Sequence, residues 1–286
     1  MHQPSYRVTD FHIHIQPFRQ LKPAVMDVMR RGKERQFDFL MALMDDPKLL
    51  LRTMDEQGIR RVGMVNYPSP NIMGFDESTN EFAVRYAAAD PSRLIPYGGV
   101  DPVTTRDARG AVEALVAMGT RVLKLHPPHQ GFAANDYTKG LDPLAAIYRT
   151  CEARGLPVLV HTGTSIFPGA RSKYGNPMEL DDVAIDFPAL RLIMAHGGRP
   201  LYMAEAFFIL RRHRHVLLDL SGIPPRSLLE YFPRIAELES QLLWGTDWPS
   251  PGVESMRKNV DQFLALPLSD GVKRATLETN AERLLP

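Results

Sequence analysis

Short, continuous apolar runs recur along the chain, and segments with helical periodicity separate them. Val, Ile and Leu dominate these runs, as is typical of parallel strands that are buried on both faces. The pattern predicts eight strands, at residues 7–15, 60–66, 94–100, 121–126, 157–161, 190–196, 216–221 and 241–247.

Amphipathic segments fill the gaps and predict helices. They lie at residues 37–57, 76–89, 105–118, 141–154, 179–187, 201–213, 225–239 and 253–264, and a last one at 269–285 closes the chain. Gly58, Gly119 and Gly155 each end a helical segment just before a strand. A left-handed residue after a helix is least costly as glycine, so these positions support the boundaries.

Strand and helix alternate eight times in 286 residues. This alternation implies a parallel sheet, and eight units in a chain of this length predict a closed (β/α)₈ TIM barrel that forms one domain over residues 1–286. An open doubly wound sheet is the alternative, but no Gly-x-Gly-x-x-Gly turn follows the first strand. Residues 16–36 and 163–178 are long connections at the carboxyl ends of strands, where lids form over barrel active sites.

Composition excludes several classes of protein. The net charge of +1 leaves no basic footprint for nucleic acid. Cys151 is the one cysteine, so no intramolecular disulfide forms, which fits a reducing cytoplasm. The first residues lack the layout of a signal peptide, and no apolar run approaches the ~20 residues that cross a bilayer. We therefore expect a cytoplasmic protein with no membrane partner.

Side chains with metal-ligand chemistry follow the apolar runs. His12 and His14 end the first strand, and residues i and i+2 of a strand point to the same side. Two imidazoles at this spacing can bind one borderline cation such as Zn²⁺, and Asp10 is a candidate to orient one of them.

Three further strands end on such a residue: His161, His196 and Asp247. A single histidine at the end of a strand is more often a satisfied core residue. Two of them, together with a His-x-His strand and a terminal aspartate, are difficult to assign to packing alone. The combination predicts one metal site at the carboxyl end of the barrel.

The chain resembles the amidohydrolase superfamily, from DFHIH near the start to TNAERLL near the end. Within it, the chain is similar to the amidohydrolase-related branch that includes aminocarboxymuconate-semialdehyde decarboxylase and resorcylate-type decarboxylases. The resemblance implies that His12, His14, His161 and Asp247 bind a divalent metal, with Zn²⁺ favoured and Mn²⁺ also suited to these ligands. It implies that His196 is a ligand to a second metal or the catalytic acid/base beside a single one.

Lys124 has three interpretations. In binuclear relatives a strand-four lysine is carboxylated and bridges two metals, so a second metal requires that modification. Lys124 is otherwise a contact for an anionic substrate or a structural ion-pair residue. His126 and His129 follow the same strand and are additional candidate ligands.

The predicted rim carries candidate substrate contacts. Arg171 and Arg199 can pair with a carboxylate, and Trp248 and Phe167 can supply apolar walls.

The resemblance implies an enzyme that acts on a small molecule. We expect a hydrolase in which a metal-activated water attacks the substrate, Asp247 transfers the proton and His196 polarises the carbonyl. The alternative is a non-oxidative decarboxylase of an aromatic or unsaturated acid, and the second alternative is a non-catalytic metal- or metabolite-binding barrel. Barrels of this branch commonly pair, so a homodimer is one option.

Overall fold

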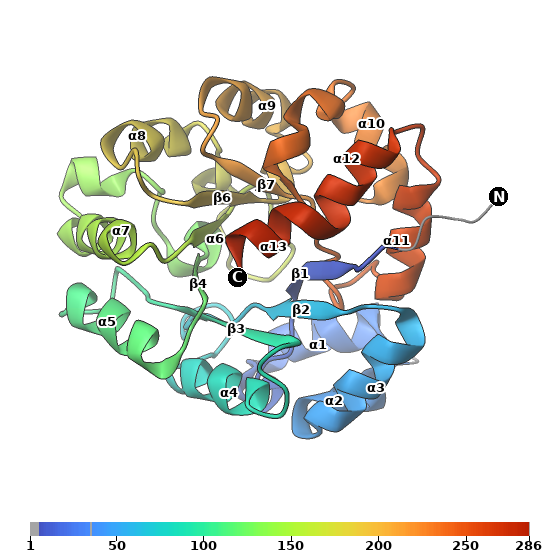
Figure 1. Cartoon of the computed structure of the whole chain (residues 1–286). Helices are drawn as coiled ribbons and strands as arrows, with labels where there is room; N and C mark the ends of the chain where they lie inside the picture. The colour runs from blue at the N-terminus through green and yellow to red at the C-terminus, as the bar shows by residue number, and fades with distance from the viewer. Residues whose placement is uncertain (1–5, 35, 286) are drawn as a thin grey trace.

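The computed structural model describes residues 6–34 and 36–285, and its centre is one parallel sheet of eight strands (Figure 1). The strands pair in sequence order, from β1 to β8, as the alternation predicts. Their bounds are β1 (Thr9–Ile13), β2 (Arg61–Met64), β3 (Leu94–Gly99), β4 (Val122–Leu125), β5 (Val158–His161), β6 (Leu192–Ala195), β7 (Leu217–Asp219) and β8 (Leu242–Leu243). The TIM-barrel fold is confirmed; the ends of the expected domain, residues 1–5 and 286, lie outside the described residues.

Helices surround the strands (Figure 1). Their bounds are α1 (Pro23–Gly32), α2 (Phe37–Asp45), α3 (Pro47–Gln57), α4 (Ser78–Ala87), α5 (Ala108–Met118), α6 (Pro127–Gln130), α7 (Asp142–Arg154), α8 (Glu179–Asp186), α9 (Met203–Arg212), α10 (Leu228–Tyr231), α11 (Met256–Leu264), α12 (Asp270–Arg274) and α13 (Asn280–Leu284). Gly58, Gly119 and Gly155 follow α3, α5 and α7 with φ of 65°, 95° and 60°, which confirms the three predicted helix ends. Within the described part of the chain, no helix is long and apolar enough to span a bilayer.

Two expected helices are interrupted, and proline accounts for both. Residues 37–57 form α2 and α3, because Pro47 lacks the N–H that would continue the first helix and Asp46 caps the second. Residues 225–239 form only α10 between 3₁₀ turns, because Pro233 disfavours a helical Phe232. The segment at 269–285 is helical, with a π-helical turn (Ala275–Thr279) between α12 and α13.

The region of β1 meets the segment that follows β8 at a seam, where backbone hydrogen bonds join the two. The amide of Phe11 donates to the carbonyl of Trp244 at 2.7 Å, and the amide of His14 donates to that of Trp248 at 2.8 Å. The amide of Asp247 donates in the other direction, to the carbonyl of His12 at 2.8 Å. These bonds bring the end of β1 beside the segment that follows β8.

The inner face of the barrel changes from apolar to polar along β4, β5 and β7. Val122 and Leu159 belong to one buried apolar cluster, and the partly buried Leu217 packs against it. Side chains on a strand alternate, so the residues two positions later face the same interior. On β4, β5 and β7 these are Lys124, His161 and Asp219, and they lie toward the carboxyl end of the barrel.

Candidate active site

Three predicted ligands converge at the seam. His12 Nε2 lies 3.3 Å from His14 Nε2, and Asp247 Oδ1 lies 3.0 Å from His14 Nε2 and 3.4 Å from His12 Nε2. Ligand atoms held at about 2.0–2.2 Å from one ion stand roughly 3.0–3.5 Å apart. The three atoms therefore fit a divalent cation between them.

Asp219, at the end of β7, holds His12 in place. Its Oδ2 lies 2.5 Å from His12 Nδ1, so Nδ1 carries the proton and Nε2 keeps the lone pair that a metal needs. The expectation that Asp10 orients an imidazole is wrong. The Asp10 carboxylate instead accepts hydrogen bonds from the amide of Thr246 at 2.9 Å and from its hydroxyl at 2.6 Å. Asp219 comes directly after the apolar residues 216–218 of the seventh predicted strand. This position is the sequence signal that identifies it as a candidate site residue.

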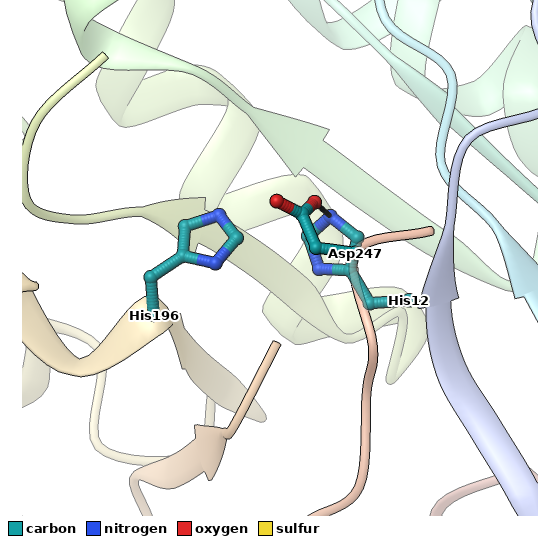
Figure 2. A group of neighbouring side chains, drawn as sticks. All are labelled: His12, His196 and Asp247. Atoms are coloured by element: carbon teal, nitrogen blue, oxygen red, sulfur yellow. Dashed lines mark ion pairs between the residues drawn. The ribbon is translucent and has the colours of Figure 1, made fainter. Parts of the chain in front are cut away.

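His196 stands across from His12 and Asp247 (Figure 2). Ligand atoms of His12, His196 and Asp247 all lie within 4.8 Å of one another, which makes this trio a possible metal-binding group. His196 Nδ1 lies 2.8 Å from the carbonyl of Ser221, which can only accept. Nδ1 therefore carries the proton and Nε2 has a free lone pair.

Strained backbone marks the two residues predicted to be catalytic. His196 and Asp247 both have φ of 66°, a left-handed conformation that residues other than glycine seldom adopt. Such strain persists where the surrounding structure fixes it and is common at functional sites.

His161 ends β5 beside the trio. Its Nε2 lies 3.3 Å from the carbonyl of Thr164, and its ring centre lies 4.6 Å from that of His196. The structure thus brings His161 to the site, and its role as a ligand stays a prediction.

Lys124 lies at the floor of the site with its side chain fully enclosed. The residue is 1% exposed, and its Nζ has no hydrogen-bond partner among the described residues. Burial lowers the pKa of Lys124 to about 8, although the nearby Asp219 and Asp247 act in the opposite direction. An unpaired buried ammonium is costly, so Lys124 is a plausible partner for an anion or for a modification that supplies one.

Protonation states at neutral pH suit metal ligation. Burial lowers the pKa of His12, which Asp219 opposes, and burial lowers the pKa of His196 to about 3. Burial would raise the pKa of Asp247, but its hydrogen bond with His14 and the neighbouring imidazoles bring it well below the usual range. The site thus presents neutral imidazoles beside a carboxylate, the forms that bind a cation.

A cavity of about 460 Å³ opens over these residues. Its polar floor includes His12, His14, Lys124, His161, His196 and Asp247. Its apolar wall includes Phe18, Leu21, Met29, Met73, Phe167 and Ile223. Several of these wall residues come from residues 16–36, so that long connection does border the site.

The predicted substrate contacts divide into two groups. Arg199 lines the cavity, and the space above Gly222 is bordered by Arg199 Nη2, His196 Nδ1 and Asp247 Oδ2, at 3.0, 3.1 and 3.2 Å from where a Cβ would stand. Arg171 is exposed and does not line the cavity. Trp248 is 2% exposed and packs in the hydrophobic core, outside the cavity lining.

A TIM barrel with histidine and aspartate ligands at the carboxyl ends of its strands defines a class of metal-dependent enzymes. The sequence matches the amidohydrolase family over residues 9–286, so the chain belongs to this family of metal-dependent enzymes. Comparison with curated proteins found no match.

Solved structures share the fold at low identity. An uncharacterized TIM-barrel protein from Bordetella bronchiseptica is 22% identical with a TM-score of 0.79, covering 97% of this chain and 98% of its own. A probable 2-pyrone-4,6-dicarboxylic acid hydrolase from Acinetobacter baumannii, with citric acid bound, is 15% identical with a TM-score of 0.67 over 98% and 99% of the two chains. A 5-carboxyvanillate decarboxylase from Novosphingobium aromaticivorans, with manganese bound, is 16% identical with a TM-score of 0.64 over 98% and 96%.

Proposed function

We propose that this protein is a metal-dependent hydrolase of a small, carboxylate-bearing substrate. The observation that carries the proposal is the convergence of His12, His14 and Asp247 on one point, beside a cavity whose floor holds the unpaired cation Lys124 and the guanidinium of Arg199. Zn²⁺ is the favoured metal and Mn²⁺ the second choice, since imidazole and carboxylate ligands suit both.

A cation bound by His12, His14 and Asp247 would lower the pKa of a coordinated water toward neutrality and polarise a substrate oxygen. Asp247 uses Oδ1 for its contacts with the two imidazoles, while Oδ2 lies at the space above Gly222. We assign Oδ2 the transfer of the proton from the water to the leaving group.

His196 has its Nδ1 proton committed to the carbonyl of Ser221. Its free Nε2 therefore suits a proton acceptor or a metal ligand, rather than the donor that would polarise a carbonyl. We propose the acceptor role for a site with one metal, and the ligand role if a carboxylated Lys124 brings in a second.

The cavity is complementary to an acid with an apolar body. Arg199 offers paired N–H donors that match a carboxylate, and Lys124 adds a second positive charge. Phe18, Met73 and Phe167 provide an apolar wall opposite this polar floor. A small lactone, ester or amide that carries a carboxylate satisfies both halves.

Decarboxylation of an aromatic or unsaturated acid is the second candidate. The same cavity would accept a flat acid, and one structural neighbour is a decarboxylase with manganese bound. In that reaction Asp247 or His196, once it has accepted a proton, would protonate the carbon that loses the carboxylate. A non-catalytic metal- or metabolite-binding barrel is the third candidate.

Turnover assays separate these functions. Protein loaded with Zn²⁺ or Mn²⁺ is offered lactones, esters and amides of small carboxylic acids, and in parallel hydroxybenzoates with detection of CO₂. We expect hydrolysis, its loss after chelation, and its recovery when the metal is returned. Asp247→Asn should remove more than ~99% of the activity, as expected when a ligand and a proton carrier are lost together.

Arg171→Ala is the matched control, because Arg171 is an exposed cation outside the cavity. It should hydrolyse at the wild-type rate, whereas Arg199→Ala should raise KM. Release of CO₂ without hydrolysis of any ester, lactone or amide would defeat the proposal in favour of decarboxylation.

A further inference from the structure

Three imidazole rings form a stack along one side of the cavity. His126 lies between His129 and His161, with ring centres 3.5 Å and 3.8 Å away and planes tilted by 12° and 19°. The ring centre of Tyr67 lies 5.1 Å from that of His126. With a ring packed on both faces, the imidazole of His126 cannot turn without moving its neighbours.

One end of the stack is fixed by hydrogen bonds. His129 Nδ1 lies 2.9 Å from the hydroxyl of Tyr67, and its Nε2 lies 2.7 Å from the hydroxyl of Ser165. Both ring nitrogens of His129 are therefore satisfied. His129 therefore has a structural role of its own, and its fixed ring restricts the rotation of the His126 ring that stacks on it.

The ring of His126 differs from that of His129 in this respect. The residue is 5% exposed, and its Nδ1 is fully buried without a hydrogen-bond partner. Its Nε2 makes no hydrogen bond to the described residues and is not enclosed, so it is the nitrogen that the cavity can reach. A buried polar atom without a partner destabilises a protein. Packing alone would favour an apolar ring here, so the nitrogens need another explanation.

We propose that His126 is a substrate-binding residue of this cavity, whose Nε2 hydrogen-bonds a neutral oxygen, hydroxyl or carbonyl, of the bound substrate. The residue lines the cavity together with Lys124 and Arg199, so a substrate held by its carboxylate at those cations lies within the same space. The stack presets the orientation of the ring, which lowers the cost of ordering it on binding. This inference rests on the proposed function only in taking the cavity as the substrate site.

Binding of four probes tests the proposal without any turnover. Benzoate and its 2-, 3- and 4-hydroxy derivatives are titrated into the metal-loaded protein by calorimetry. At least one hydroxy derivative should bind the wild type roughly 3- to 10-fold more tightly than benzoate, the gain expected from one hydrogen bond. His126→Phe, which keeps a ring in the stack and removes both nitrogens, should bind that derivative and benzoate equally. His126→Asn should recover part of the preference.

Unfolding in urea provides the second measurement. His126→Phe should be at least as stable as the wild type, because it removes an unpaired buried polar group. The matched variant His129→Phe should be less stable, because it breaks the contacts to Tyr67 and Ser165.

Three outcomes would overturn the inference: no hydroxy derivative binds better than benzoate, His126→Phe keeps the preference, or His126→Phe loses as much stability as His129→Phe. If the preference depends on His126 while no ester, lactone or amide is hydrolysed, only the proposed hydrolysis fails.

Discussion

A carboxylate outside the proposed cation site determines how one of the proposed ligands is presented. Asp219 fixes the tautomer of His12 through a contact of 2.5 Å and also accepts the hydroxyl of Ser221 at 2.7 Å. Ser221 in turn lies 3.0 Å from Nδ1 of both His12 and His196. One side chain on β7 thereby positions His12 on β1 directly and, through Ser221, His196 just after β6.

Asp219→Asn should weaken metal binding by about 10-fold or more, in the range seen when a partner of a ligating histidine is changed. The substitution keeps the size of the side chain and removes the charge that favours the Nδ1–H tautomer of His12. Competition with a chromophoric chelator measures the Zn²⁺ dissociation constant of both proteins.

Asp10→Asn is the control, since Asp10 is equally buried but, within the described part of the chain, its carboxylate accepts only from the amides of His12 and Thr246 and from the hydroxyl of Thr246. Burial raises the pKa of Asp10 to about 7, so a neutral amide is tolerated there. Its metal affinity should match that of the wild type. Equal losses in both variants would show that Asp219 acts through general stability.

The part of the site that can be predicted from the sequence consists of residues whose direction follows from the alternation of side chains along a strand. His12 lies near the end of β1, and His14, His196 and Asp247 follow the ends of β1, β6 and β8, so their meeting follows from the fold. Asp219 was accessible by the same rule. The loop residues were not, because the contacts of Arg171 and Trp248 depend on backbone paths that no periodicity encodes; one is exposed and the other is in the core.

At the scale of elements, helix boundaries depend on single capping residues. The apolar pattern runs unbroken from residue 37 to 57, yet the chain forms α2 and α3. Asp46 accepts a hydrogen bond from the amide of Lys48 at 2.8 Å and begins the second helix. The periodicity shows which face of a helix is buried, whereas Pro47 and the capping residue Asp46 determine where one helix ends and the next begins.

Asp46→Ala should destabilise the protein by about 1 kcal/mol, the usual cost of an N-cap aspartate. Urea unfolding monitored by circular dichroism gives the value. Among the described residues, the side chain of the adjacent Asp45 pairs only with the exposed Arg19, so Asp45→Ala should cost less. A larger loss from Asp45→Ala would contradict the capping role.

At the scale of the whole molecule, the alternation of strands and helices was sufficient to predict the closed barrel. Eight buried runs and the helices between them leave few topologies that bury both faces of the sheet. The lengths of the strands were overestimated, and β8 is two residues long. Residues beyond a strand end stay buried in the loops around the cavity, so burial alone does not delimit a strand.

Stability of the whole protein should also depend on the protonation of one glutamate. Glu179, the first residue of α8, accepts a hydrogen bond from the amide of Ala134 at 3.1 Å, and burial raises its pKa from 4.5 to about 7. A carboxyl with a raised folded-state pKa lowers stability as pH rises from about 4.5 to about 7. Below that window the residue is protonated in both states and has no such effect.

Glu179→Gln keeps an oxygen for Ala134 and cannot ionise. It should exceed the wild type by about 1 kcal/mol at pH 8, a value reduced for the partial exposure of the group, and match it at pH 4.5. Urea unfolding at both pH values provides the comparison. An equal difference at both would refute the assignment.

The seam between the two ends of the barrel has a consequence for synthesis. His12 and His14 leave the ribosome early, while Asp247 follows only after seven further strands have been made. A nascent or truncated chain that stops before β8 presents two imidazoles without their carboxylate and cannot assemble the proposed cation site. Once the ends meet, an ion bound by His12, His14 and Asp247 would link the region of the first strand to the segment that follows the last. Tight metal uptake would therefore report that the chain has been translated and folded through to its final strand.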